Sequence, residues 1–229
     1  MSKGRRKTKT PDPARLRTGS GIKARWFITA AAGLWLAAFG RDRLDDWIDA
    51  TDLPPLVVQT STEELDRNGN LLRAYTVADG RWRLAVGLDE VDPRYIDMLL
   101  TYEDRRFRDH PGVDWRGLIR AGWQAATNGR IVSGGSTLTM QVARLLEEGT
   151  TGQVGGKLRQ MRVALALERR LSKDEILSLY LHLAPYGGNL EGIRAASISY
   201  FGKEPARLTP AEAALLVAIP QSPETRRPS

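Results

Sequence analysis

The chain has 229 residues without cysteine, with 34 Lys or Arg against 27 Asp or Glu, which gives a formal net charge of +7. Nine of the positive charges lie before residue 26, where Asp12 is the one acidic residue, so the first 25 residues carry +8 and the remainder carries −1. A near-neutral globular part behind a basic tail is typical of membrane topology and argues against a nucleic-acid-binding surface.

The first 40 residues predict a basic tail followed by a membrane anchor. Residues 1–25 are poor in apolar side chains, so we expect them to be unfolded and cytoplasmic. Residues 26–40 are uncharged between Arg25 and Arg41, and a helix of about 15 residues is about 22 Å long. That is short of the roughly 30 Å hydrocarbon core, but snorkelling basic side chains make a single-pass helix workable. A cleaved signal peptide fits the same pattern, and we favour the anchor because no clear Ala-x-Ala site follows.

The next segments predict a stalk and a small β element. Residues 41–60 would form the stalk, since Pro54 and Pro55 close any helix begun at Arg41. The segment Glu64–Tyr75 has Asn-Gly at its middle, which favours a β-hairpin, and residues 81–86 predict one further short strand.

A helix after Asp92 carries the first candidate functional residue. Asp92 can cap this helix and Pro93 can begin it. Glu103 and Phe107 then lie one helical turn apart, and the Arg105–Arg106 pair favours an ionised carboxylate. Glu103 is therefore a candidate proton acceptor. The alternative is a solvated face of Glu-Arg salt bridges.

A second predicted helix spans Trp115 to Thr127, with Asp114 as its cap and Asn128-Gly129 at its end. Trp115, Ile119 and Trp123 fall on one side of this helix. They predict either a membrane-surface element that meets a lipid-linked substrate or an ordinary face packed on the core.

The run Gly134-Gly-Ser-Thr137 precedes a third predicted helix. Backbone N–H groups and the hydroxyls of Ser136 and Thr137 at the positive end of a helix suit phosphate or pyrophosphate. Gln141 and Arg144 continue a polar stripe from Thr137 at spacings of four and three residues. An ordinary capped helix is the alternative interpretation.

The last third of the chain predicts further helices. A glycine-rich loop at residues 152–156 leads into a helix over Lys157–Leu171, and capping boxes begin two more at Ser172 and Thr209. Residues 184–192 predict a polar loop, residues 195–201 predict core, and residues 221–229 are typical of a linker.

Three motifs in order resemble one known family. They are Glu-Asp-Arg-Arg-Phe-x-x-His-x-Gly-Val-Asp at 103–114, Gly-Gly-Ser-Thr-Leu-Thr-x-Gln at 134–141, and Lys-x-Glu-Ile-Leu-x-x-Tyr-Leu at 173–181. The chain resembles the peptidoglycan glycosyltransferase domain, glycosyltransferase family 51, of class A penicillin-binding proteins. Thr-Met-Gln-Val-Ala-Arg and Ala-Pro-Tyr-Gly-Gly are similar to the type 1C proteins in particular.

The resemblance implies a mainly α, lysozyme-like, two-lobed domain at residues 61–220. It also implies polymerisation of lipid II into β-1,4 glycan with inversion and release of undecaprenyl pyrophosphate, on the periplasmic side of a bacterial inner membrane. Expected partners are lipid II, nascent glycan, the membrane and other cell-wall synthases, with no nucleic acid. Glu103 would be the base, with Asp104 beside it. The substrate-binding residues that the resemblance implies are Phe107, His110, Ser136, Thr137, Gln141, Arg144, Lys157 and Gln160.

Two departures from the family pattern keep alternatives open. Gln160 stands where many members have a second Glu, and His182 stands where Asn is usual. Leaving-group help would then come from Arg144, Lys157 or a divalent cation such as Mg²⁺, held by Asp104 or by substrate phosphates. For both histidines, a structural role is the expectation. A lysozyme-like murein hydrolase and a non-catalytic lipid II-binding module remain alternative functions.

Overall fold

The computed structural model describes residues 20–129, 135–147 and 154–228, and it divides the chain into two units, Met1–Ala50 and Thr51–Ser229. In the first unit, α1 (Ser20–Asp49) is a single helix of 30 residues. Nowhere in the described ranges is a helix both long enough and apolar enough to cross a membrane. The anchor over residues 26–40 stays a prediction. Most of the predicted basic tail lies outside the described residues.

The segment predicted as a stalk is a helix end followed by a packed strap. Helix α1 ends at Asp49, which precedes Pro54 and Pro55, so the prolines are not what ends it. Residues 51–61 have no regular secondary structure, yet Leu53, Leu56 and Val58 pack against the hydrophobic core of the second unit. These three apolar side chains thus fasten the strap to the domain.

Within the described ranges, the β structure consists of two small sheets. The predicted hairpin is confirmed: β1 (Thr62–Leu65) pairs antiparallel with β2 (Leu71–Tyr75), and Gly69 at the turn has φ 83°. In the second sheet, β3 (Trp82–Arg83) pairs parallel with β5 (Leu190–Glu191), which pairs antiparallel with β4 (Pro185–Gly187). The strand expected over residues 81–86 is thus shorter, and the loop expected over residues 184–192 is instead a hairpin.

Helices dominate the second unit, and their first residues follow the predicted caps. Asp92, Asp114, Ser172 and Thr209 each accept a backbone N–H of the helix that they precede. The α-helices are α2 (Pro93–Glu103), α3 (Trp115–Asn128), α4 (Leu138–Leu146), α5 (Val154–Arg170), α6 (Lys173–Leu183), α7 (Ile193–Phe201), α8 (Pro210–Ala218) and α9 (Pro223–Arg226). The described residues also form the 3₁₀ turns η2 (Leu88–Glu90), η3 (Phe107–Asp109), η4 (Pro205–Arg207) and η5 (Ile219–Gln221).

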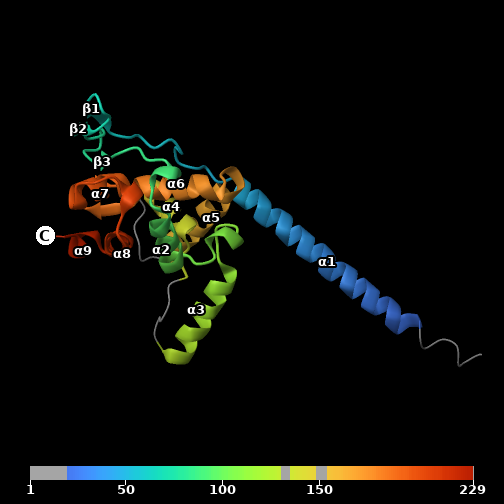
Figure 1. The fold of residues 1–229 in the computed structure, drawn as a ribbon. Coiled ribbons are helices and arrows are strands. Elements are labelled where there is room, and N and C mark those ends of the chain that lie inside the picture. The colour runs from blue at the N-terminus through green and yellow to red at the C-terminus, as the bar shows by residue number, and fades with distance from the viewer. Residues whose placement is uncertain (1–19, 130–134, 148–153, 229) are drawn as a thin grey trace, which may run out of the picture. The chain divides into compact units, whose positions relative to one another are not determined.

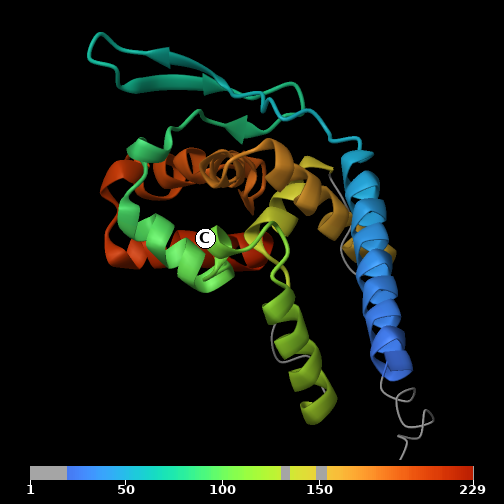
Figure 2. The same ribbon diagram turned by 90° about the vertical axis from the view of Figure 1, so that its right-hand side faces the viewer.

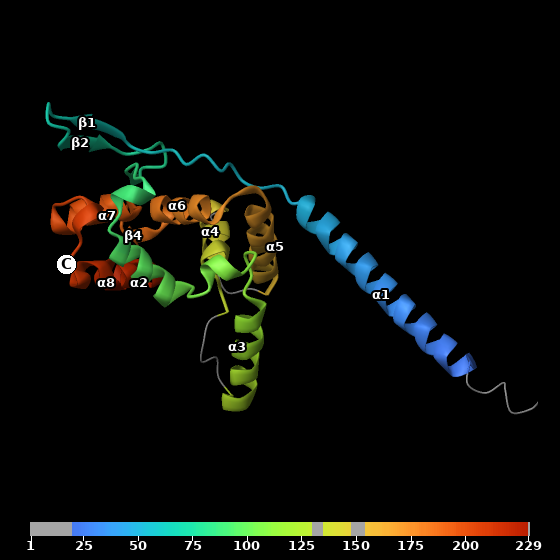
Figure 3. The ribbon, with the colours of Figure 1, turned by 45° about the vertical axis from the view of Figure 1, so that its right-hand side comes forward.

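The core lies where α4 packs between α5 and α6, and α2 packs on α8. Its largest fully buried side chains include Tyr95, Phe107, Leu138, Tyr180 and Tyr186. The β1–β2 hairpin and α3 lie on opposite sides of this helical core (Figure 1), as two further views also show (Figures 2 and 3). Helix α3 extends away from the core, which leaves most of its length without a neighbouring helix.

Candidate active site

Glu103 is the last residue of α2, and its carboxylate faces a cleft. The helix ends there because Asp104 leaves helical geometry, with φ −158° and ψ 77°. Glu103 Oε2 accepts a hydrogen bond from Gln141 Nε2 at 2.8 Å, and Oε1 accepts one from Gln221 Nε2 at 3.1 Å. The half-buried carboxylate is therefore held by one amide from α4 and one from the end of the domain.

One expectation about the surroundings of Glu103 is wrong, and Arg106 has a different carboxylate as its partner. Because α2 ends at Glu103, Phe107 does not share its helix face; Phe107 begins η3 and is 1% exposed within the core. Arg106 donates to both oxygens of Asp114 and not to Glu103. Burial raises the pKa of Asp114, but hydrogen bonds from Arg106 and the Gly117 amide outweigh it and hold that pKa below its ordinary value. Asp114 is thus an ionised helix cap.

Asp104 points inward, away from the chemistry expected of it. Its Oδ2 accepts the backbone N–H of Leu138 at 2.9 Å, and His110 Nε2 lies 3.0 Å from both oxygens. Asp104 and His110 are both buried. These contacts fasten the first turn of α4 to the loop after α2, so this part of the site is a structural brace.

The brace continues through Lys173, which begins α6. Its Nζ donates to the carbonyl of His110 at 2.6 Å and to Glu168 at 2.7 Å, and it lies 4.5 Å from the Phe107 ring centre. Thr139 in turn donates to Glu168 at 2.6 Å. Lys173 of the third sequence motif therefore stabilises the first motif through direct contacts. Because Phe107 and His110 are buried, they are not exposed to a substrate.

The start of α4 differs from the predicted phosphate cradle. Thr137 donates to the carbonyl of Gly112 and accepts the N–H of Met140 at 3.2 Å, while Asp104 takes the N–H of Leu138. Gly112 has φ 89°, and a Cβ there would lie 2.7 Å from a backbone oxygen of α5, so this close approach needs glycine. The hydroxyl and two N–H groups are therefore already used. Gly134 lies outside the described residues.

Positive charge gathers instead around Lys157 and Arg144. Lys157 Nζ donates to Ser136 Oγ, and its pKa is lowered by partial burial and by the nearby charge of Arg144. No carboxylate in the described parts of the chain pairs with Arg144. Two half-buried cations from α4 and α5 thus lie close to each other, an arrangement that suits an anion such as a diphosphate.

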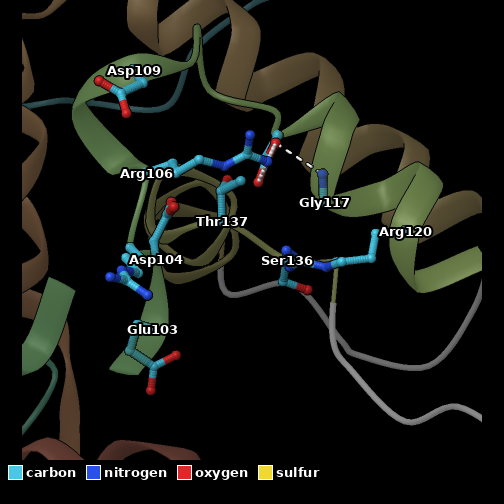
Figure 4. A pocket seen from close by; sticks show the side chains of 11 residues that line it. Glu103, Asp104, Arg106, Asp109, Gly117, Arg120, Ser136 and Thr137 are labelled. Carbon is cyan, nitrogen blue, oxygen red and sulfur yellow. Dashed lines mark hydrogen bonds and ion pairs between the residues drawn. The ribbon is translucent and has the colours of Figure 1, made fainter. Parts of the chain in front are cut away.

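A cleft of about 570 Å³ connects the base candidate with the start of α4. Figure 4 shows Glu103, Arg120 and Ser136 around this hollow, each from a different element. A second cleft, of about 600 Å³, contains Arg144, Gln160 and Leu53. The first cleft is lined by Glu103, Asp104, Arg105, Arg106, Asp109, Asp114, Gly117, Arg120, Gly135, Ser136 and Thr137.

The comparison with a family model decides the classification. A sequence model of the transglycosylase family matches residues 68–229. The chain belongs to the transglycosylase family. The resemblance drawn from the three motifs is thereby confirmed.

Curated relatives of this transglycosylase chain include several penicillin-binding proteins. Penicillin-binding protein 1C of Escherichia coli (strain K12) is 49% identical over 205 residues, which are 89% of this chain and 26% of that protein. Penicillin-binding protein 1F of Bacillus subtilis (strain 168) is 33% identical over 177 residues, 77% of this chain and 24% of that protein. The chain thus spans about a quarter of the length of these relatives.

The two histidines of this transglycosylase have different surroundings. His182 accepts the N–H of Val86 at 3.2 Å and donates to the Ser178 carbonyl at 2.8 Å, so its expected structural role is confirmed. The buried Nδ1 of His110 has no hydrogen-bond partner among the described residues. No group of three or more His, Cys, Asp or Glu suited to a metal ion occurs in the part of the chain that the structure describes. The oxygens of Asp104, one of the two alternatives that we gave for holding a divalent cation, already accept protein donors.

Helix α3 resolves one open alternative. Trp115, Ile119 and Trp123 are 50%, 74% and 73% exposed, so this side is not packed on the core. Leu118, on another side, packs with Val113 and Met140. The transglycosylase unit therefore presents a protruding apolar face next to the candidate cleft, because Gly117 and Arg120 of the same helix line that cleft.

Sequence reasoning missed Gln221. The segment after residue 220 was expected to be a linker, whereas Ile219–Gln221 and Pro223–Arg226 form short helical turns. Pro220 and Pro223 each stand in the first turn of one of these elements, a position that proline favours. That spacing is the signal that could have indicated an ordered end to the domain.

Proposed function

We propose that this chain is a peptidoglycan glycosyltransferase that polymerises lipid II into β-1,4 glycan. Membership of the transglycosylase family supports this activity. The observation that carries the proposal is the direct 2.8 Å contact between Glu103 and Gln141, which joins the candidate base to the helix of the second motif. An isolated carboxylate far from α4 would have removed the case for an enzyme.

In this reaction Glu103 acts as the general base. Its carboxylate takes the proton of the acceptor's sugar 4-hydroxyl while that oxygen attacks the anomeric carbon of the glycan donor. The bond from the anomeric carbon to the diphosphate oxygen breaks, and the electron pair leaves with undecaprenyl pyrophosphate. Attack opposite the leaving group converts the α-linked donor into a β-1,4 product. The amide of Gln141 donates to this carboxylate without neutralising it.

Lys157 and Arg144 stabilise the charge of the departing diphosphate. Gln160 has no acidic proton with which to protonate the leaving group, and a diphosphate that remains paired with two cations does not need one to leave. Ser136 holds Lys157 in place through its hydroxyl. In this proposal the anion site therefore lies between α4 and α5, with Ser136 just before the start of α4 and Arg144 in its last turn.

Helix α3 brings the site to the lipid. Its exposed Trp115, Ile119 and Trp123 suit the interface of a bilayer, where amphipathic aromatic side chains lie at headgroup depth. We place this contact at the outer face of the bacterial cytoplasmic membrane, where lipid II presents its sugars. A two-lobed, lysozyme-like arrangement is part of the same proposal, with α3 and its surroundings as the smaller lobe.

Incubation of the purified protein with labelled lipid II in detergent tests this function. Wild-type protein should produce polymer, and Glu103→Gln should reduce the rate by about 100-fold or more, because a general base contributes roughly 10²–10⁴ in rate. Gln160→Glu should retain activity. Polymerisation at the wild-type rate by Glu103→Gln contradicts the base assignment.

The same incubation, run in parallel with preformed glycan as substrate, separates the alternatives. Cleavage of preformed glycan without polymerisation would identify a murein hydrolase. Binding of lipid II without any product in the wild type would identify a non-catalytic module of a wall-synthesis complex, with Gln160 as the residue to examine first.

A further inference from the structure

Gln221 contacts the candidate base from a segment outside the three sequence motifs. Its Nε2 lies 3.1 Å from Glu103 Oε1, and the other oxygen of Glu103 accepts from Gln141. The two amides therefore hold opposite oxygens of one carboxylate. Each carboxylate oxygen has more than one acceptor direction, so both can still accept a substrate hydroxyl.

The neighbours of Gln221 determine which way its amide points. Tyr102 donates its hydroxyl proton to Gln221 Oε1 at 3.2 Å, and Arg226 donates to the same oxygen at 3.1 Å. A guanidinium has donors only, and an ionised carboxylate has acceptors only. The oxygen of Gln221 must therefore face Arg226, and its NH₂ must face Glu103.

Arg226 links this arrangement to the rest of the domain. The same Nη1 also donates to the carbonyl of Ala218, the last residue of α8, at 2.8 Å. Ile219, which lies between Ala218 and Gln221 in the chain, is fully buried in the core. The side chain of Gln221 thus extends from a fastened backbone, even though it is itself exposed to solvent.

We propose that Gln221 is a positioning residue for the reaction. It fixes the plane of the Glu103 carboxylate together with Gln141, and Tyr102 and Arg226 keep its amide in the donating orientation. This inference rests on the proposed function, because it assigns Gln221 a part in the use of Glu103 as a base. It goes further by making the α8–α9 segment a part of the active site.

Steady-state kinetics of lipid II polymerisation test the role of Gln221. Gln221→Met keeps the length of the side chain and removes the donor, so kcat should fall about tenfold while KM stays within about twofold. Gln59→Met makes the same chemical change at an exposed position outside the cleft and should leave both constants unchanged. Tyr102→Phe should lower kcat less, because it removes only one of the two hydrogen bonds that orient the Gln221 amide. Equal kcat values for Gln221→Met and Gln59→Met would overturn the proposal.

Gln221→Glu provides a readout that a purely structural role would not change. It places a second carboxylate against Glu103, and a like charge in contact disfavours ionisation of the other carboxyl group. The pH of maximal rate should therefore shift upward relative to the wild type. A pH profile identical to that of the wild type argues against contact between the two side chains during catalysis.

The contact can also be measured without turnover. In ¹⁵N-labelled protein, Glu103→Ala should shift the side-chain amide signals of Gln221 and leave those of Gln59 in place. Failure of this shift overturns the inference, whether or not the protein polymerises lipid II. Loss of polymerisation in Glu103→Gln, together with full activity in Gln221→Met, would leave the proposed function standing and remove the part assigned to Gln221.

Discussion

The neighbouring carboxylates of Glu103 and Asp104 lie on opposite faces of the chain at the end of α2 and have different surroundings. On the buried face, Asp104 accepts from Leu138 and His110 and is 7% exposed. On the open face, Glu103 accepts from two neutral amides and borders the cleft. Asp104 therefore holds α4 against the loop. Glu103 keeps free acceptor directions for a substrate.

Replacement of Asp104 tests the buried face. Asp104→Ala leaves the N–H of Leu138 and the ring of His110 without their partner, so the free energy of unfolding should fall by about 3 kcal/mol. Glu103→Ala should cost less than about 1 kcal/mol, because its partners can turn to water. Chemical denaturation of both variants makes the measurement. Equal losses would mean that the two faces do not differ in the way described.

Lys157 tests whether the cation pair between α4 and α5 binds anions. Lys157→Met should weaken the binding of inorganic pyrophosphate about tenfold, while Lys203→Met, far along the chain on a surface salt bridge, should leave it unchanged. Burial and Arg144 lower the pKa of Lys157, so its charge is lost at a lower pH than that of an ordinary lysine. Wild-type binding should therefore weaken as the pH rises through this lowered pKa, with proton uptake on binding there. Calorimetry in buffers of different ionisation enthalpy measures both effects.

The α3 face extends the open side toward lipid. Trp123→Ser should reduce partitioning onto phosphatidylcholine vesicles about fivefold, since a large apolar side chain loses its partial burial in the interface. Trp82→Ser, on β3, is the matched control and should change partitioning little. Similar effects of the two substitutions would indicate nonspecific adsorption rather than docking through α3.

Glu212 lies in the capping box of α8 and provides a reference remote from both faces. Its hydrogen bond from Lys203 and the N–H of Thr209 lower its pKa from 4.5 to about 2. The carboxylate therefore stabilises the folded state above pH 4.5, and this contribution is lost as the pH falls toward 2. The stability difference between wild type and Glu212→Gln should shrink over that range. A difference that stays constant down to pH 2 would contradict the assignment.

The sequence allowed the helix starts and the hairpin to be predicted because these depend on local chemistry. Asp92, Asp114, Ser172 and Thr209 cap the expected helices, and Gly69 occupies the expected turn. The surroundings of side chains depended on long-range packing instead. Thr137 was expected to contact a phosphate, but its hydroxyl donates to the carbonyl of Gly112, which lies 25 residues earlier in the chain.

Gln221 also shows that contacts made by long-range packing could not be predicted from the sequence. It lies 118 residues from Glu103 in the chain, and no local pattern joins the two positions. The α3 tryptophans were ambiguous for a related reason, because periodicity groups residues on one face without revealing what covers that face.

Chemical rescue tests the central claim, that Glu103 faces the substrate as a base, most directly. Glu103→Ala opens space for a small carboxylate, so added formate should restore lipid II polymerisation in a concentration-dependent manner. Glu103→Gln keeps the space filled and should not respond. Polymerisation by Glu103→Ala at the wild-type rate without formate would contradict the claim, as would equal stimulation of both variants.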